Sequence, residues 1–176
     1  MGRTEDLIDA AWEARREGRY RDAERGLLDA IERSRRAGLT LQLIRALEIL
    51  GHVVRDAGQE QRALALYDEA VLLSREQGDV LLLAHTVRHL GELHRGAGRS
   101  DAAERCFVEA LSLYRAAASP PALDVANALR PMAMLKESQG DTTAARQLWS
   151  EAQDLYSAAG IQPGVDECVR HLEKLR

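Results

Sequence analysis

The sequence is poor in aromatic residues, which make up only 4% of its 176 residues. Sheet proteins draw heavily on aromatic and β-branched residues, so this shortage argues against a β-sandwich or a barrel. Hydrophobic residues still account for 45% of the chain, and most of them are Leu, Ala and Val. This composition is sufficient for a core and favours closely packed helices, that is, an all-α fold.

Cysteines and long apolar runs are also scarce. Cys106 and Cys168 are the two cysteines, too few for a disulfide framework, so we expect two reduced thiols that pack between helices. No apolar run reaches the ~18 residues of a membrane-spanning helix, and the N-terminus does not read as a charged and then apolar leader. We therefore expect a cytoplasmic protein that does not bind membranes.

The net charge is −4, which argues against nucleic-acid binding because the phosphate backbone requires a basic surface. Lysine is nearly absent: Lys136 and Lys174 stand against 22 arginines. Arginine suits planar recognition of carboxylates, but codon usage in a GC-rich genome explains an overall preference for it. Only the placement of the arginines is therefore informative about function.

The sequence repeats itself. The segment LGHVVRDAG at 50–58 returns as LGELHRGAG at 90–98, and eight positions recur with a period of about 40 residues. The four sets are Leu7, Ala10, Ala11, Ala14, Gly18, Ala23, Leu27 and Ala30; Leu47, Leu50, Gly51, Val54, Gly58, Ala63, Tyr67 and Ala70; Val87, Leu90, Gly91, His94, Gly98, Ala103, Phe107 and Ala110; and Leu129, Met132, Ala133, Lys136, Gly140, Ala145, Trp149 and Ala152.

Each repeat predicts a pair of helices. Apolar residues at intervals of three and four form one helix face, and the glycine of each set ends the first helix. A second helix follows, in which a small alanine allows close approach and a larger side chain, such as Tyr67 or Phe107, fills the space between the helices. Since neither helix can bury its apolar face alone, the pairs must stack. We therefore expect nine helices, no strand, and turns near Gly18, Gly58, Gly98 and Gly140.

This pattern resembles the tetratricopeptide repeat, W-x2-L-G-x2-Y followed by A-x3-F and A; the segments 47–70 and 87–110 match it well. The period exceeds the family's usual ~34 residues and is similar to the long-helix variety of bacterial regulators and kinesin light chains. The resemblance implies a right-handed superhelical α-solenoid in one domain, 1–176. It implies repeats at about 4–38, 41–78, 80–117 and 121–159, and a C-terminal capping helix at about 163–175.

Three prolines modify this picture. In the insertion at 118–126, Ser119 or Pro120 is expected to open the next helix, with Pro121 in its first turn. Pro131 lies inside a first helix, where it removes one backbone hydrogen bond and should kink the helix.

The expected capping helix continues the repeat. It would place Val169 and Leu172 in the register of Leu129 and Met132.

No motif for catalysis or for a cofactor is evident: we find no nucleophile elbow, paired carboxylates or phosphate-cradling loop. His85, His89 and Glu92 share one helix face and are a candidate metal site, but the spacing also follows from the helical period, and a solvated face is the favoured interpretation. We therefore expect a non-catalytic protein with no cofactor and no metal.

One line of residues on the first helices faces neither the core nor the second helix. The resemblance implies that it lines a concave groove where a protein or peptide binds, and we call it the first-helix stripe. The expected contacts are Trp12, Arg15, Arg45, His52, Arg55, His85, Arg88, His89, Glu92, Arg95, Asn127, Arg130 and Met134. The stripe also contains Glu5, Ile8, Glu48, Glu137, Glu167, Arg170 and Lys174.

Eight bases and five acids give the stripe a net charge of +3, so an acidic segment is the expected partner. Arg88 is central and is expected to dominate binding, while His52, His85 and His89 should add positive charge as the pH falls toward ~6.5. Other interpretations are a merely solvated helix face, a sensor or regulatory domain of a larger signalling or transcription-regulating system, and a self-association module.

Overall fold

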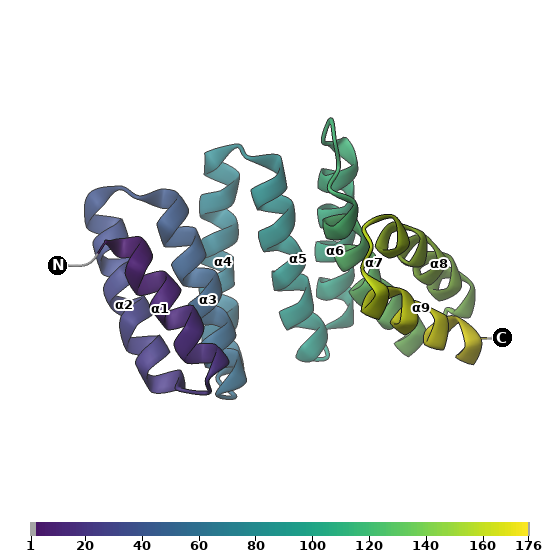
Figure 1. The fold of residues 1–176 in the computed structure, drawn as a ribbon, viewed down its shortest axis with the longest axis horizontal. Coiled ribbons are helices and arrows are strands. Elements are labelled where there is room, and N and C mark those ends of the chain that lie inside the picture. Colours follow the sequence, from purple (N-terminus) through teal and green to yellow (C-terminus); the bar gives the residue numbers. More distant parts are fainter. Residues whose placement is uncertain (1–2, 176) are drawn as a thin grey trace. The chain divides into compact units, whose positions relative to one another are not determined.

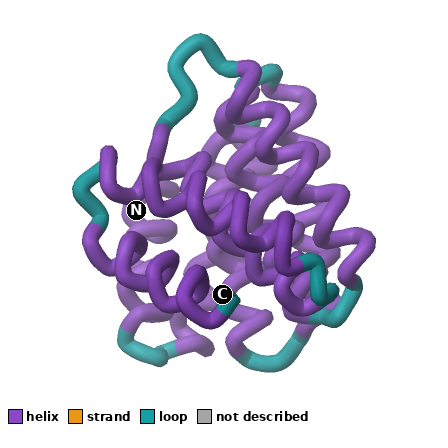
Figure 2. Tube along the Cα trace, turned by 90° about the vertical axis from the view of Figure 1, so that its right-hand side faces the viewer, coloured by secondary structure: helices purple, strands orange, loops and turns teal. Residues whose placement is uncertain are grey.

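The computed structural model describes residues 3–175, and this part of the chain forms nine α-helices. In chain order they are α1 (Thr4–Arg16), α2 (Tyr20–Ala37), α3 (Thr40–Asp56), α4 (Glu60–Gln77), α5 (Val80–Gly96), α6 (Ser100–Ala116), α7 (Ala122–Ser138), α8 (Thr142–Ala158) and α9 (Gln162–Lys174) (Figure 1). Within the described range no residue is in a strand, as the helices and loops of Figure 2 show. The expected all-helical architecture is confirmed.

The helices fall into two compact units. Unit 1 ends at Asp79 and contains α1 to α4; unit 2 starts at Val80 and contains α5 to α9. Within each unit the helices pack as consecutive antiparallel hairpins, α1 with α2 and α3 with α4, then α5 with α6 and α7 with α8. The last helix, α9, packs on α8. The expectation of a single domain stays a prediction.

The turn between the helices of a pair is built around a glycine, as Gly58 illustrates. Its φ of +77° is the left-handed conformation that glycine adopts without strain. The next residue, Gln59, donates its backbone N–H to the carbonyl of Val54 (2.8 Å), which satisfies an otherwise free acceptor at the end of α3. Gly18, Gly98 and Gly140 have the same positive φ, so the predicted turn positions are confirmed.

A second kind of glycine sets how closely the helices of a pair approach. A Cβ atom at Gly51 would lie 2.5 Å from Cε2 of Tyr67, and one at Gly91 would lie 2.7 Å from Cε1 of Phe107. Both aromatic rings are fully buried. Burial of such a ring contributes roughly 1.5–3 kcal/mol relative to its exposure, and it requires that the facing helix present bare backbone. The glycine and the aromatic residue are therefore one packing unit, and both lie within a single repeat of the sequence.

The start of α7 differs from the expectation. The helix begins at Ala122, and Pro121 is its N-cap residue in an extended conformation (φ −67°, ψ 114°). A residue that precedes proline is pushed out of the helical region, and this applies to both Ser119 and Pro120. The helix therefore begins only after the second proline. Pro131 lies buried inside α7, and the helix continues through it; the expected kink stays a prediction.

Helix α9 is fixed to unit 2 by one face. Cys168 is fully buried, and a Cβ at Gly164 would lie 2.6 Å from the ring of Tyr156. Farther along α9, His171 stacks on Trp149 with ring centroids 4.2 Å apart. Glu137 accepts a hydrogen bond from the indole of Trp149 and lies 2.7 Å from His171 Nδ1. These contacts attach α9 to both helices of the preceding pair.

On the opposite face of α9, the burial of the side chains differs from what the repeat register predicts. Val169 corresponds to the fully buried Leu129, yet it is 36% exposed, whereas Leu172 is half-buried against the core of unit 2. In earlier pairs this face is covered by the pair's own second helix, and no helix follows α9 among the described residues. The register of Val169 therefore does not lead to burial.

Candidate functional site

The first-helix stripe lies on α1 and α3 in unit 1 and on α5, α7 and α9 in unit 2. Most of its members are exposed or half-buried, as a binding surface requires. Ile8 is an exception, since it is fully buried in the core of unit 1. Its assignment to the stripe was wrong because the core face of α1 is turned relative to the register: Ile8 is buried, whereas the register position Ala10 is exposed. Trp12, one turn later, is 37% exposed.

In unit 1, the three arginines of the stripe are paired with aspartates that the register did not include. Arg15 donates to Asp56 from Nε (3.1 Å) and Nη2 (2.8 Å), and Arg55 donates to the same carboxylate (3.0 Å). Arg45 donates to Asp9 (2.7 Å). The guanidinium of Arg15 also lies 5.3 Å from the ring of Trp12, a cation–π distance.

Asp56 is the centre of this arrangement. Burial alone would raise the pKa of its carboxyl, but hydrogen bonds from Arg55 and Arg15 together lower that pKa below its usual value. The carboxylate is therefore held in its charged form and offsets part of the positive charge of the two arginines beside it. Sequence reasoning missed Asp56 and Asp9 because each lies one residue away from a stripe position. Their spacing from Arg15 and Arg45, close to one repeat period, is the available signal.

His52 of the stripe is also engaged within unit 1. Its Nε2 lies 2.9 Å from the hydroxyl of Tyr67, and the two rings meet edge to face with centroids 5.6 Å apart. The imidazole thus gives the Tyr67 hydroxyl a hydrogen-bond partner, and the Tyr67 ring fills the space between α3 and α4. Its position is fixed by packing as much as by exposure to a partner.

In unit 2, Arg88 lies deep in the surface and is only 7% exposed. Its Nη1 donates to Glu92 (2.7 Å) and its Nη2 donates to Nε2 of His89 (2.7 Å). Because Arg88 can only donate, His89 accepts at Nε2 in this arrangement. Sequence reasoning placed Arg88 at the centre of the stripe but could not show that its guanidinium is already occupied.

His85 lies beside this group, with its ring centroid 4.6 Å from that of His89. Burial of the imidazole, together with the positive charge of Arg88, holds the pKa of His85 below 6.5. The expectation that His85 gains charge as the pH approaches 6.5 is therefore corrected: it stays neutral to lower pH. Within residues 3–175 no group of three His, Cys, Asp or Glu side chains is placed to hold a metal ion.

On α7, Arg130 donates to Glu167 of α9 (3.1 Å), and Asn127 accepts a hydrogen bond from the hydroxyl of Tyr156 (2.8 Å). Met134 is half-buried and packs against the core of unit 2. Burial raises the pKa of the neighbouring Cys168 thiol to about 11, so this thiol stays protonated at neutral pH and is a poor nucleophile. This part of the stripe offers recognition groups rather than reactive ones.

Arg95, near the end of α5, differs from the ion-paired arginines of the stripe. Its Nε is buried and has no hydrogen-bond partner in the described chain, and no carboxylate there forms an ion pair with it. A guanidinium that is partly removed from water and lacks an acceptor is unfavourable unless something else supplies one. Arg95 therefore retains more capacity to bind an anion than the paired arginines do.

The charge of the stripe differs between the units once the ion-paired aspartates are included. Unit 1 has three arginines against four carboxylates, a net charge of −1: Arg15, Arg45 and Arg55 with Glu5, Asp9, Glu48 and Asp56. Unit 2 has five cations against three carboxylates, a net charge of +2: Arg88, Arg95, Arg130, Arg170 and Lys174 with Glu92, Glu137 and Glu167. The positive charge expected from the sequence therefore lies in unit 2.

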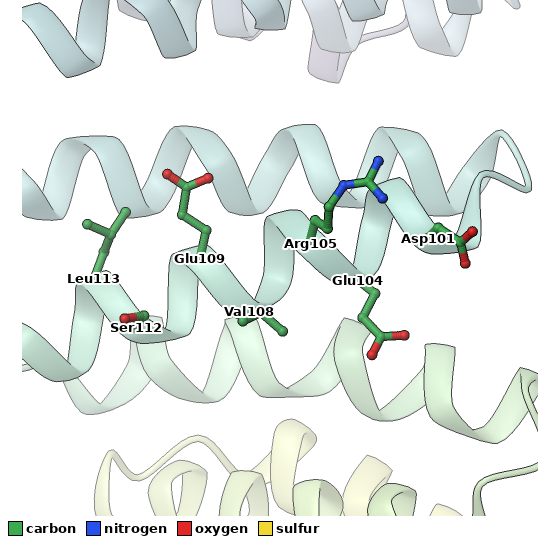
Figure 3. A pocket seen from close by; sticks show the side chains of 7 residues that line it. All are labelled: Asp101, Glu104, Arg105, Val108, Glu109, Ser112 and Leu113. Carbon is green, nitrogen blue, oxygen red and sulfur yellow. The ribbon is translucent and has the colours of Figure 1, made fainter.

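A different surface feature lies on the outer face of α6, where a depression of about 610 Å³ is lined by Asp101, Glu104, Arg105, Val108, Glu109, Ser112 and Leu113 (Figure 3). Val108 is 53% exposed within it. Figure 3 shows Arg105 and Glu109 on one side of the helix and Glu104 on the other. Since all the lining residues belong to one helix, no groups converge from different elements, and the depression does not define a binding site.

None of the described helices is long and apolar enough to span a bilayer. The helix pairs, their glycine turns and the glycine–aromatic contacts together define a helical-repeat protein. Residues 42–116 match the family model described as "Tetratricopeptide repeat". The same helix-pair pattern occupies the rest of the described chain, which has the fold of a tetratricopeptide-repeat solenoid.

Solved structures agree on the fold. BtubC (BKLC) from P. vanneervenii matches with a TM-score of 0.75 and 20% identity, over 98% of this chain and 79% of that one. A putative kinesin light chain from Podosopora anserina, with nearly identical TPR-like repeats, matches with a TM-score of 0.73 and 12% identity, over 99% and 97%. The apo form of RapI matches with a TM-score of 0.81 and 13% identity. The match covers 89% of this chain and 57% of RapI. Comparison with curated protein sequences finds no match.

Proposed function

We propose that this protein is a non-catalytic binding scaffold whose first-helix stripe in unit 2 recognises an acidic segment of a partner protein. Tetratricopeptide repeats generally serve as protein-interaction scaffolds, which supports the first half of the proposal. The second half rests on one observation, the net charge of +2 on the stripe of unit 2. A surface of this sign favours and steers a negatively charged partner.

The proposed contact surface keeps the expected residues that lie on unit 2 but assigns them different roles. Arg95 and Arg130 are half-buried, and Arg170 and Lys174 are exposed; these four cations are available to a partner. Arg88 is buried and acts instead as a positioning residue that holds Glu92 and His89. Met134 supplies an apolar contact on unit 2, whereas Trp12, which is 37% exposed, lies on unit 1 and is not part of this surface.

The proposal includes a cytoplasmic setting and excludes nucleic acid as a partner. The net charge of −4 over the whole chain supports this exclusion, because the basic part of the stripe is small and the remaining surface repels phosphate. A protein segment that carries a few carboxylates fits such a surface better than a polyanion does.

The direct test is a titration of the whole chain with a fluorescent peptide rich in glutamate and amidated at its C-terminus. A lysine-rich peptide of the same length is the control. We expect binding of the acidic peptide alone, with an affinity that falls as the salt concentration rises, because part of the attraction is screened. Equal binding of both peptides, or binding of neither, would contradict the proposal.

A further inference from the structure

The two units can be compared at one repeat position, where each has an arginine. Arg15 of α1 has its counterpart in Arg95 of α5, two repeat periods later. In unit 1, Arg15 is held by Asp56, the last residue of α3, the next first helix. In unit 2 the next first helix is α7. Once the insertion at 118–126 is counted, the residue in register with Asp56 is Ser138, again the last residue of its helix.

The substitution of serine for aspartate leaves Arg95 without the acceptor that Arg15 has. The Ser138 hydroxyl donates to the carbonyl of Leu135 (2.7 Å), so it is turned toward its own helix. The Nε of Arg95 is buried with no hydrogen-bond partner within residues 3–175. By contrast, Nε of Arg15 donates to Asp56 over 3.1 Å. The two arginines share a register but differ in whether the chain itself supplies a carboxylate.

We propose that Arg95 is the anchor of the acidic partner and that a side-chain carboxylate of the partner occupies, beside Arg95, the place that the Asp56 carboxylate occupies beside Arg15. This inference rests on the proposed function and makes it specific. The chemistry is that of Arg15 and Asp56, where two guanidinium nitrogens donate to one carboxylate oxygen. Such charge-assisted hydrogen bonds are about twice as strong as neutral ones.

Three variants test the assignment in the intact chain. Ser138→Asp supplies the missing carboxylate and should occupy Arg95 internally. Arg95→Ala removes the anchor. Each should weaken binding of the amidated glutamate peptide by at least about tenfold, the size of one good charge-assisted contact. Arg15→Ala is the matched variant in unit 1 and should leave the affinity within about twofold, because Asp56 already occupies Arg15.

Two controls separate the internal pairing from other effects. Ser138→Asn has nearly the shape of the aspartate variant without its charge and should bind like the wild type. Ser150→Asp adds the same charge on the exposed face of α8, away from the stripe, and should also bind like the wild type. Loss of binding in Ser150→Asp equal to that in Ser138→Asp would show that only the overall charge matters and would overturn the assignment of Arg95.

A nuclear magnetic resonance titration gives a readout on the residue itself. The Nε–H signal of Arg95, identified by its loss in Arg95→Ala, should shift when the acidic peptide is added, and should already be shifted in Ser138→Asp. If the peptide binds the wild type but this signal stays in place, Arg95 is not the anchor while the proposed function stands. If the acidic peptide does not bind the wild type at all, the proposed function fails and the anchor fails with it.

Discussion

Unit 1 and unit 2 are built from the same repeat but present different surfaces on their first helices. In unit 1 every stripe arginine is paired with an aspartate, and the net charge is −1. In unit 2 the net charge is +2, Arg88 is buried, and Arg95 has no ion-pair partner among the described residues. The repeat fixes the glycine, alanine and aromatic positions that pack the pairs. The charge of the surface is decided by residues outside those packing positions, which can change from repeat to repeat.

The largest effect is expected where the two units are alike. Ala63 in unit 1 and Ala103 in unit 2 are fully buried at the same register position. Replacement of either one by Leu should overpack its helix pair and lower the free energy of unfolding by about 1–3 kcal/mol, measured by urea unfolding. Ala65→Leu, on the exposed face of α4, is the control and should leave the midpoint unchanged. Losses that differ strongly between Ala63 and Ala103 would show that the two pairs do not share one packing scheme.

The second prediction removes the difference in charge. Asp9→Asn together with Asp56→Asn changes the stripe of unit 1 from a net charge of −1 to +1 and releases its three arginines. The Arg45–Asp9 pair is exposed and the pairs to Asp56 are partly buried, so the double variant should lose about 1–2 kcal/mol in the free energy of unfolding. It should gain affinity for the glutamate peptide, because unit 1 now resembles unit 2. An unchanged affinity would mean that the charge of unit 1 does not contribute to recognition.

The third prediction concerns the pH dependence of unit 1. The pKa of Asp56 is lowered in the folded state, so its contribution to stability is present above the unfolded pKa of ~3.9 and is lost as the pH falls through the lower folded value. The wild type should therefore lose stability below pH ~4 more steeply than Asp56→Asn does. Parallel acid-unfolding curves for the two proteins would contradict the ion pairing.

The smallest effect is expected for His85 in unit 2. Its folded pKa is depressed, so below the unfolded value of ~6.5 the unfolded chain binds a proton that the folded chain rejects. The wild type should lose stability as the pH falls from ~6.5 toward the folded pKa, with no further loss from this group below it. His85→Gln should remove that loss. A wild-type stability that rises over this window would contradict the buried neutral imidazole.

Much of the fold follows from the sequence because the repeat period records where helices touch. The turns at Gly58 and Gly98 and the contact of Gly51 with Tyr67 are each set within a single helix pair, so a local pattern is enough to find them. The start of α7 was missed by a few positions because two adjacent prolines act together on the residues before them.

The site was less predictable, because its properties depend on side chains that meet between successive pairs. The bond from Arg15 to Asp56 joins α1 to α3 and depends on how far these helices lie apart, which the register does not give. The burial of Arg88 likewise depends on the packing around α5 rather than on its position in the repeat. The charge balance of the stripe could therefore not be predicted from the repeat register alone.

If unit 2 rather than unit 1 recognises the acidic partner, a matched charge reversal should weaken binding in unit 2 and leave it nearly unchanged in unit 1. Arg130→Glu and Arg45→Glu each break one ion pair of a half-exposed arginine, with Glu167 and with Asp9. Calorimetric titration with the amidated glutamate peptide should give at least about tenfold weaker binding for Arg130→Glu and a change within about twofold for Arg45→Glu. Equal losses for the two variants, or a larger loss for Arg45→Glu, would show that unit 2 is not the part of the chain that recognises the acidic partner.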